Sequence, residues 1–214
     1  MLRFTPDNAQ PQIEILCSDV APAAEEKNHF VAGEGGPTRI INASAYYVIL
    51  GGKVSLYRSE TCDEPKVALH EVLHALGFDH NQNPESIMYP VTNCRQHLDQ
   101  YIIDTIDDLY KADSLPDLSI VDVSASKGGR YLFFDIGVAN YGLRDASAVN
   151  LTVLADGNEV RSFDLQGITI GTKKVFSVQN LRIPTGTQHV SFRVETTDGS
   201  KELSYTNNRE DLTV

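Results

Sequence analysis

The stretch HEVLHALGFDH, residues 70–80, determines how this sequence is interpreted. It combines H-E-x-x-H with a glycine and a third histidine further along. Histidines at positions i and i+4 of a helix lie on one face, so His70 and His74 can reach a single metal ion. Gly77 can turn the chain sharply enough for His80 to return to the same ion. The spacing therefore predicts a metal site with three nitrogen ligands.

Glu71 follows the first of these ligands and can reach a water molecule at the ion without being a ligand itself. Three protein ligands leave a fourth position open, which distinguishes a catalytic from a structural Zn²⁺ site. H-E-x-x-H alone would also fit a core helix that carries two histidines by chance. With about 2% His and about 6–7% Glu and Gly, all five positions match by accident on the order of 10⁻⁵ times per chain. The pattern predicts zinc on His70, His74 and His80, with Glu71 as the catalytic general base.

The residues around this stretch have helical spacing. From Pro65 to Leu76 apolar residues line most of the circumference, which predicts a buried helix that ends at Gly77. From Leu98 to Tyr110 apolar residues recur on one face. We expect this second helix to pack against the first and to close the domain.

Upstream of the histidines the pattern has the period of β-strands. Gln12–Asp19 alternates apolar and polar residues and predicts a half-buried strand. Val20–Pro37 is rich in Ala, Glu and Gly and predicts a connecting loop. Tyr46–Leu50 and Lys53–Arg58 are strand-like runs separated by Gly51–Gly52, which predicts a hairpin.

After residues 112–116 the sequence changes to short β-rich runs without helical spacing. Seven short strands over about 100 residues are typical of a β-sandwich. The sequence thus predicts two domains, residues 1–112 and residues 117–214. The seven runs are Leu118–Val123, Tyr131–Val138, Val149–Leu154, Val160–Phe163, Lys174–Val178, His189–Thr196 and Glu202–Tyr205.

Composition excludes several classes of protein. Hydrophobic residues are 41% and charged residues 22% of the 214, as in folded globular domains. The net charge is −11, and no Lys/Arg cluster could neutralise phosphates, so nucleic acid is not an expected partner. Apolar runs stay below the roughly 18 residues of a membrane span. Residues 1–10 lack the pattern of an export signal, so we expect neither a membrane span nor a signal within this chain.

The sequence contains three cysteines, Cys17, Cys62 and Cys94. Cys62 and Cys94 flank the histidine stretch, and a disulfide between them would clamp its two ends in an oxidising compartment. Unpaired buried thiols are the alternative, which suits Cys17 best because it lies in an apolar strand-like run. The sequence alone leaves the bridge open.

The stretch 70–80, with its Leu-Gly-Phe-Asp-His end, resembles the metzincin metallopeptidases, and among them the matrixins. Further on, the sequence SIMYP around Met88 is similar to the methionine turn of that family. The resemblance implies an α+β zincin domain with a twisted mixed sheet, a zinc helix and a C-terminal helix. It implies that Met88 lies under the zinc and that Tyr89 and Pro90 begin the wall of the pocket for the residue after the scissile bond. It also implies a protein or peptide substrate extended along an edge strand, for which we expect Tyr46–Leu50.

The sequence departs from the matrixins at three points. An inhibitory cysteine propeptide motif, the helix before the sheet and acidic calcium loops are not recognisable. We therefore expect no calcium. Isolated histidines at positions 29, 97 and 189 are expected to be structural or surface residues.

Two motifs in the second half, Asn140-Tyr141-Gly142 and the run Tyr205–Asn208, resemble the CARDB modules of bacterial and archaeal surface proteins. The resemblance implies an all-β immunoglobulin-like sandwich, a cell-surface or extracellular setting and a ligand there. The sequence thus predicts a zinc endopeptidase with an adhesion or targeting domain. The alternatives are a non-catalytic zinc-containing adhesion protein and a peptidase acting on small peptides or cell-wall links.

Overall fold

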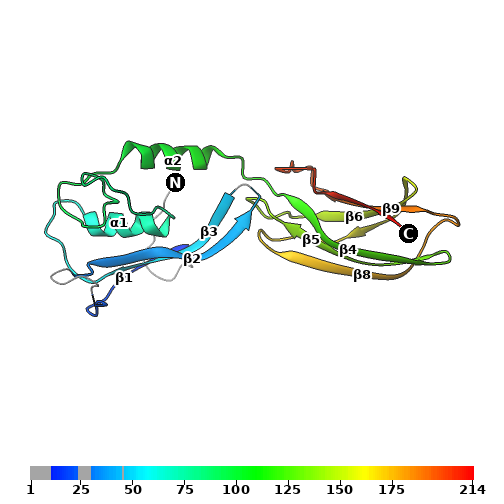
Figure 1. Cartoon of the computed structure of the whole chain (residues 1–214), viewed down its shortest axis with the longest axis horizontal. Coiled ribbons are helices and arrows are strands. Elements are labelled where there is room, and N and C mark those ends of the chain that lie inside the picture. The colour runs from blue at the N-terminus through cyan, green and yellow to red at the C-terminus, as the bar shows by residue number, and fades with distance from the viewer. Residues whose placement is uncertain (1–10, 24–29, 45) are drawn as a thin grey trace. The chain divides into compact units, whose positions relative to one another are not determined.

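The computed structural model describes residues 11–23, 30–44 and 46–214. The regular secondary structure of these residues is mostly β-strand, with two helices (Figure 1). The chain divides into two compact units. The first comprises Met1–Ile41 and Tyr47–Ala112, and the second comprises Asn42–Tyr46 and Asp113–Val214.

The sheet of the first unit contains β1 (Ile13–Cys17), β2 (Gly33–Ala43) and β3 (Tyr46–Leu56), in the order β1-β3-β2. β1 pairs parallel to the second half of β3, from Ile13 opposite Gly52 to Cys17 opposite Leu56. β3 is the middle strand of this sheet and β2 is an outer strand. The expectation of Tyr46–Leu50, which lies in β3, as the edge strand is therefore wrong.

The predicted hairpin at Gly51–Gly52 is also wrong, because β3 runs straight through both glycines. Gly52 is buried, and a Cβ atom there would lie 3.1 Å from the Cβ of Ala75 in the first helix. Its N–H donates to the carbonyl of Gln12. The glycine thus allows close approach of helix and sheet instead of a turn.

Two further expectations for this region need correction. The predicted loop Val20–Pro37 extends too far, because β2 already begins at Gly33. Cys17 is exposed and free, not buried. Residue 17 ends β1, most of whose side chains are exposed.

The two helices of the first unit are α1 (Lys66–Ala75) and α2 (Gln100–Lys111), within two residues of the predicted bounds. Gly77, with φ +91°, follows the end of α1 in the left-handed conformation expected for a helix stop. The buried apolar core of the unit brings α1 and α2 together with the segment between them, as predicted. It consists of Leu73, Ile87, Met88 and Ile102.

The second unit is a β-sandwich, as predicted. One sheet has the order β10-β9-β6-β7 and the other β4-β5-β8. Side chains from both sheets share one apolar core, in which Phe134 of β5 and Phe192 of β9 lie 4.9 Å apart between ring centroids. The strands are β4 (Leu118–Gly128), β5 (Tyr131–Asn140), β6 (Val149–Ala155), β7 (Asn158–Asp164), β8 (Lys173–Arg182), β9 (His189–Thr196) and β10 (Arg209–Thr213).

The last predicted strand, Glu202–Tyr205, is wrong. Glu202 is buried, and its carboxylate accepts hydrogen bonds from the Leu118 N–H and from the Asn208 amide. These bonds hold the segment in a bend. The final strand is β10, which pairs with β9 at the edge of its sheet.

Candidate metal centre

Three histidine rings converge at the end of α1. His70 and His74 lie one helical turn apart, and His80 returns to them after the turn at Gly77. Their Nε2 atoms lie 3.0 Å apart between His74 and His70, and 3.1 Å apart for each of the two pairs with His80. The histidine spacing of the sequence is thus realised as one group of nitrogens able to hold a metal ion.

The other ring nitrogens fix the protonation of these rings. His70 Nδ1 donates to the Ile87 carbonyl at 2.6 Å, and His74 Nδ1 donates to the Phe78 carbonyl at 2.7 Å. With the proton on Nδ1, both Nε2 atoms present lone pairs to each other, an arrangement that a cation between them stabilises. Nitrogens at about 2.0–2.1 Å from one tetrahedral ion lie about 3.3–3.4 Å apart, close to the spacing found. The donor set therefore fits a zinc ion.

Electrostatics favour neutral rings at this site. Burial lowers the pKa of His70; the hydrogen bond to the Ile87 carbonyl opposes this shift, and the neighbouring rings of His74 and His80 add to it. Burial also lowers the pKa of His80, and His74 adds to this effect. Because a metal ion binds the neutral imidazole, these shifts favour the form that binds.

Glu71 lies on α1 directly beneath strand β2. Its side chain is buried, and burial raises its pKa to about 7, with a further increase from the charge of Glu34. The Gly35 backbone N–H opposes this shift by stabilising the charged form. A carboxyl group with a pKa near 7 is suited to accept and return a proton at neutral pH.

Two glycines that the sequence analysis missed allow this arrangement. A Cβ atom at Gly33 would lie 2.7 Å from Glu71 Cγ and 3.1 Å from Oε1. At Gly35 it would overlap the Glu71 backbone carbonyl. At Gly36 it would meet nothing within 4 Å. The i, i+2 spacing of Gly33 and Gly35 puts both on the face of β2 toward α1, a signal the sequence contained.

Met88 is 1% exposed and packs in the core of the unit, and Ile87 beside it accepts the hydrogen bond from His70. The turn is held by Ser86, which the sequence analysis did not single out. The Ser86 hydroxyl donates to Asp99 and accepts from the Met88 N–H at 3.0 Å. These bonds connect the turn to the residue before α2.

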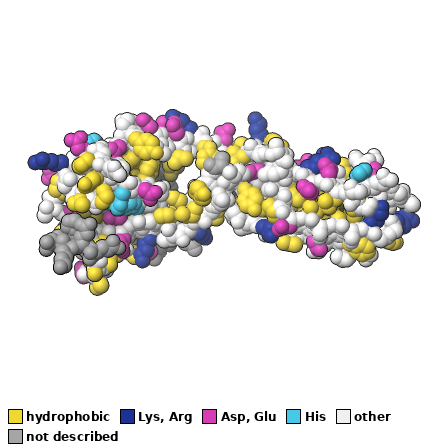
Figure 2. All heavy atoms as spheres, viewed as in Figure 1, with side chains coloured by type: hydrophobic (Ala, Val, Ile, Leu, Met, Phe, Trp, Pro, Cys, Tyr) yellow, Lys and Arg dark blue, Asp and Glu magenta, His cyan; other side chains and the backbone are white. Residues whose placement is uncertain are grey.

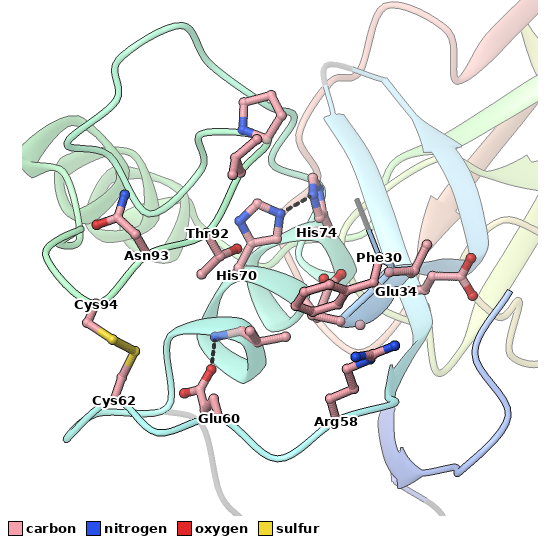
Figure 3. A pocket seen from close by; sticks show the side chains of 18 of the residues that line it. Phe30, Glu34, Arg58, Glu60, Cys62, His70, His74, Thr92, Asn93 and Cys94 are labelled. Carbon is pink, nitrogen blue, oxygen red and sulfur yellow. Dashed lines mark hydrogen bonds between the residues drawn. A yellow bond between two sulfur atoms is a disulfide. The ribbon is translucent and has the colours of Figure 1, made fainter. Parts of the chain in front are cut away.

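A cleft of about 870 Å³ opens over the histidines (Figure 3). One side is formed by residues 30–35 leading into β2, and the other by residues 90–94. Pro90 lines this cleft, whereas Tyr89 is half-buried and is not among the lining residues. Figure 2 shows histidine side chains at the surface of the first unit beside acidic ones.

A disulfide joins Cys62 to Cys94 at the rim of the cleft, with their Cα atoms 5.2 Å apart. The bridge encloses the stretch that carries all three histidines and Glu71. Of the isolated histidines, His97 and His189 are exposed, and His29 lies outside the described residues. His97 contributes its backbone, which pairs with that of Ser86.

Family models match both parts of the chain. Residues 11–111 match the model described as Matrixin, and residues 115–211 match the model described as CARDB. The resemblance to both families is thereby confirmed, and the chain combines a matrixin-like part with a CARDB domain. No curated protein matches the chain.

Solved structures resemble the second part. The crystal structure of a CARDB domain from Pyrococcus furiosus in complex with di-metal ions is 16% identical, covers 47% of this chain and 87% of its own, and has a TM-score of 0.40. The solution structure of a domain of a putative cell surface protein from Methanosarcina acetivorans is 16% identical, covers 47% and 90%, and has a TM-score of 0.38. In the described part of this chain, no helix is long and apolar enough to cross a membrane.

Proposed function

We propose that this protein is a zinc-dependent endopeptidase whose α+β zincin domain spans residues 1–112. The observation that carries the proposal is the group of three facing Nε2 atoms, 3.0–3.1 Å apart, with the Glu71 carboxyl group on the same helix. His70, His74 and His80 would hold the ion. A binding site for a structural ion would not need a buried carboxyl group beside its ligands.

The residues of the chain divide the chemistry between them. Zinc, when bound, supplies Lewis acidity that polarises a carbonyl group and makes water easier to deprotonate. Glu71 takes the proton from the attacking water and passes it to the leaving amine. The Ile87 and Phe78 carbonyls fix the orientation of the His70 and His74 rings, respectively. Met88 supports this arrangement from the core beneath.

A peptide substrate would lie extended in the cleft between β2 and residues 90–94. β2 is at the edge of its sheet, so its backbone can pair with an added strand. Pro90 contributes to the wall for the residue after the scissile bond, and Tyr89 would support it from behind. Because the cleft is open, an internal peptide bond can reach the ion, which favours an endopeptidase.

The second domain, residues 117–214, would serve in adhesion or targeting outside the cell. Supporting this are the CARDB match, the Cys62–Cys94 disulfide, which persists in oxidising compartments, and the cell-surface description of a structural relative. Its ligand would be at a cell surface or in the extracellular medium.

The test is cleavage of a mixed peptide library by the wild-type protein, by chelator-treated protein and by treated protein after zinc is returned. We expect cleavage at internal bonds, its loss with the chelator and its recovery with zinc. A zinc-loaded protein that cleaves nothing would instead favour the non-catalytic adhesion protein.

A further inference from the structure

Residues 90–94, the wall of the cleft opposite β2, belong to no helix or strand. A loop without ladder hydrogen bonds keeps a fixed shape only if side chains or covalent bonds hold its backbone. Since this wall faces the histidines in Figure 3, what holds it determines the shape of the pocket.

One buried side chain holds the wall from behind. Gln96 is 1% exposed, and its Nε2 donates to the Val91 carbonyl at 2.9 Å and to the Pro84 carbonyl at 3.3 Å. Its Oε1 accepts from the Asn93 N–H at 2.9 Å. The Gln96 amide thus binds two backbone groups of the wall, at Val91 and Asn93, and connects them to Pro84, which lies outside it. A buried amide is stable only when its groups are paired in this way.

This bonding pattern requires an amide of this length. Two carbonyl groups need donors and one N–H needs an acceptor, so only one orientation of the Gln96 amide satisfies all three. A glutamate has the same shape but offers oxygens only. Gln96→Glu would retain the bond from Asn93 and place a carboxylate oxygen against two carbonyl oxygens.

The far end of the wall is held covalently. Cys94 is bonded to Cys62, two residues after Glu60. Glu60 Oε2 in turn accepts the N–H of Val67, in the first turn of α1, at 2.7 Å. The wall is thus connected, through the disulfide and this hydrogen bond, to the helix that carries the three histidines.

We propose that Gln96 is a positioning residue that, together with the Cys62–Cys94 bridge, sets which side chain the pocket between α1 and residues 90–94 accepts after the scissile bond. This inference rests on the proposed endopeptidase function. Gln96 does not line the cleft and is not among the three metal ligands. Its replacement should therefore change substrate selection while metal binding is retained.

The test compares zinc-loaded wild type, Gln96→Glu, the double variant Cys62→Ser/Cys94→Ser and the control Gln179→Glu, an exposed residue of β8. Zinc content and thermal unfolding establish which variants are folded, and a peptide library gives KM, kcat and the preference after the scissile bond. For Gln96→Glu and for the double cysteine variant we expect one zinc per chain, a KM raised at least about tenfold, and a broader preference for the side chain after the scissile bond. kcat should change less, and the control should match wild type.

The outcomes separate the two proposals. A zinc-loaded wild type without activity contradicts the endopeptidase itself. An active wild type, with a folded Gln96→Glu of unchanged KM and preference, overturns the role of Gln96 alone. If Gln96→Glu does not fold, the double cysteine variant decides. An unchanged side-chain preference in that variant would overturn the proposal that the held wall sets the preference.

Discussion

The two units of this protein are stabilised in different ways. In the described part of the chain, the contiguous apolar cluster of the sandwich contains sixteen buried residues, whereas that of the first unit contains four. The first unit has a disulfide, a group of three histidines able to hold a metal ion, and buried polar side chains such as Ser86 and Gln96. A unit with a small apolar core commonly depends on such bonds for stability. The catalytic chemistry is thus proposed for the unit that depends least on apolar packing.

Removal of the metal should produce the largest difference in stability between the two units. An ion that binds only the folded state at 1,000 times its Kd stabilises that state by about 4 kcal/mol. In calorimetry we expect a chelator to lower the transition of the first unit and to leave that of the sandwich unchanged. Equal shifts of both transitions would contradict the assignment of the metal to the first unit.

The matched control acts on the other unit. Phe192 is fully buried in the sandwich core, and replacing such a phenylalanine with alanine costs about 3–5 kcal/mol. Phe192→Ala should lower only the sandwich transition and leave zinc binding intact.

In the metal-free protein, the ionisation of Glu71 should make the unfolding free energy depend on pH. Burial raises its pKa from 4.5 to about 7, so folding favours the protonated form. That stabilisation is present below pH 4.5 and is lost as the pH rises through 7. Relative to Glu71→Gln, which does not titrate, metal-free wild type should lose about 3 kcal/mol of unfolding free energy over this range. A constant difference between the two proteins would show that Glu71 is not buried as described.

The smallest expected effect tests the close contact between β2 and α1. Gly35→Ala would press a methyl group into the Glu71 backbone and should cost about 1–3 kcal/mol in the first unit. Gly36→Ala, the neighbouring control, meets open space and should be nearly neutral. Chemical denaturation of both variants measures the difference. Equal stabilities would mean that β2 does not lie against Glu71.

The parts of the fold that follow from local pattern were predictable from the sequence. Helical spacing gave both helices to within two residues, and the alternating runs gave most strands of the sandwich. Gly51–Gly52 was mispredicted as a hairpin turn because a glycine pair can form a turn or allow a close contact. Only the position of Ala75 in the fold shows that the contact is the role here. Glu202–Tyr205 was mispredicted as a strand because Glu202 forms its hydrogen bonds with Leu118, which is distant in sequence, and with Asn208, which follows in the next bend.

In the candidate site, too, features set by local sequence were predictable and features set by distant contacts were not. The histidines converge because short-range spacing on one helix and one turn is sufficient to bring them together. Gln96 and Ser86 could not be identified, since their roles depend on backbone groups that are adjacent only after folding. Gly33 and Gly35 were recognisable as a pair, but not their partner Glu71.

The most direct test of the central claim is the cleavage rate of Glu71→Ala carrying one zinc per chain. We expect the zinc content to equal that of wild type while the rate falls about 10³-fold, the usual contribution of a general acid–base group. A zinc-loaded Glu71→Ala that cleaves peptides at the wild-type rate would contradict it.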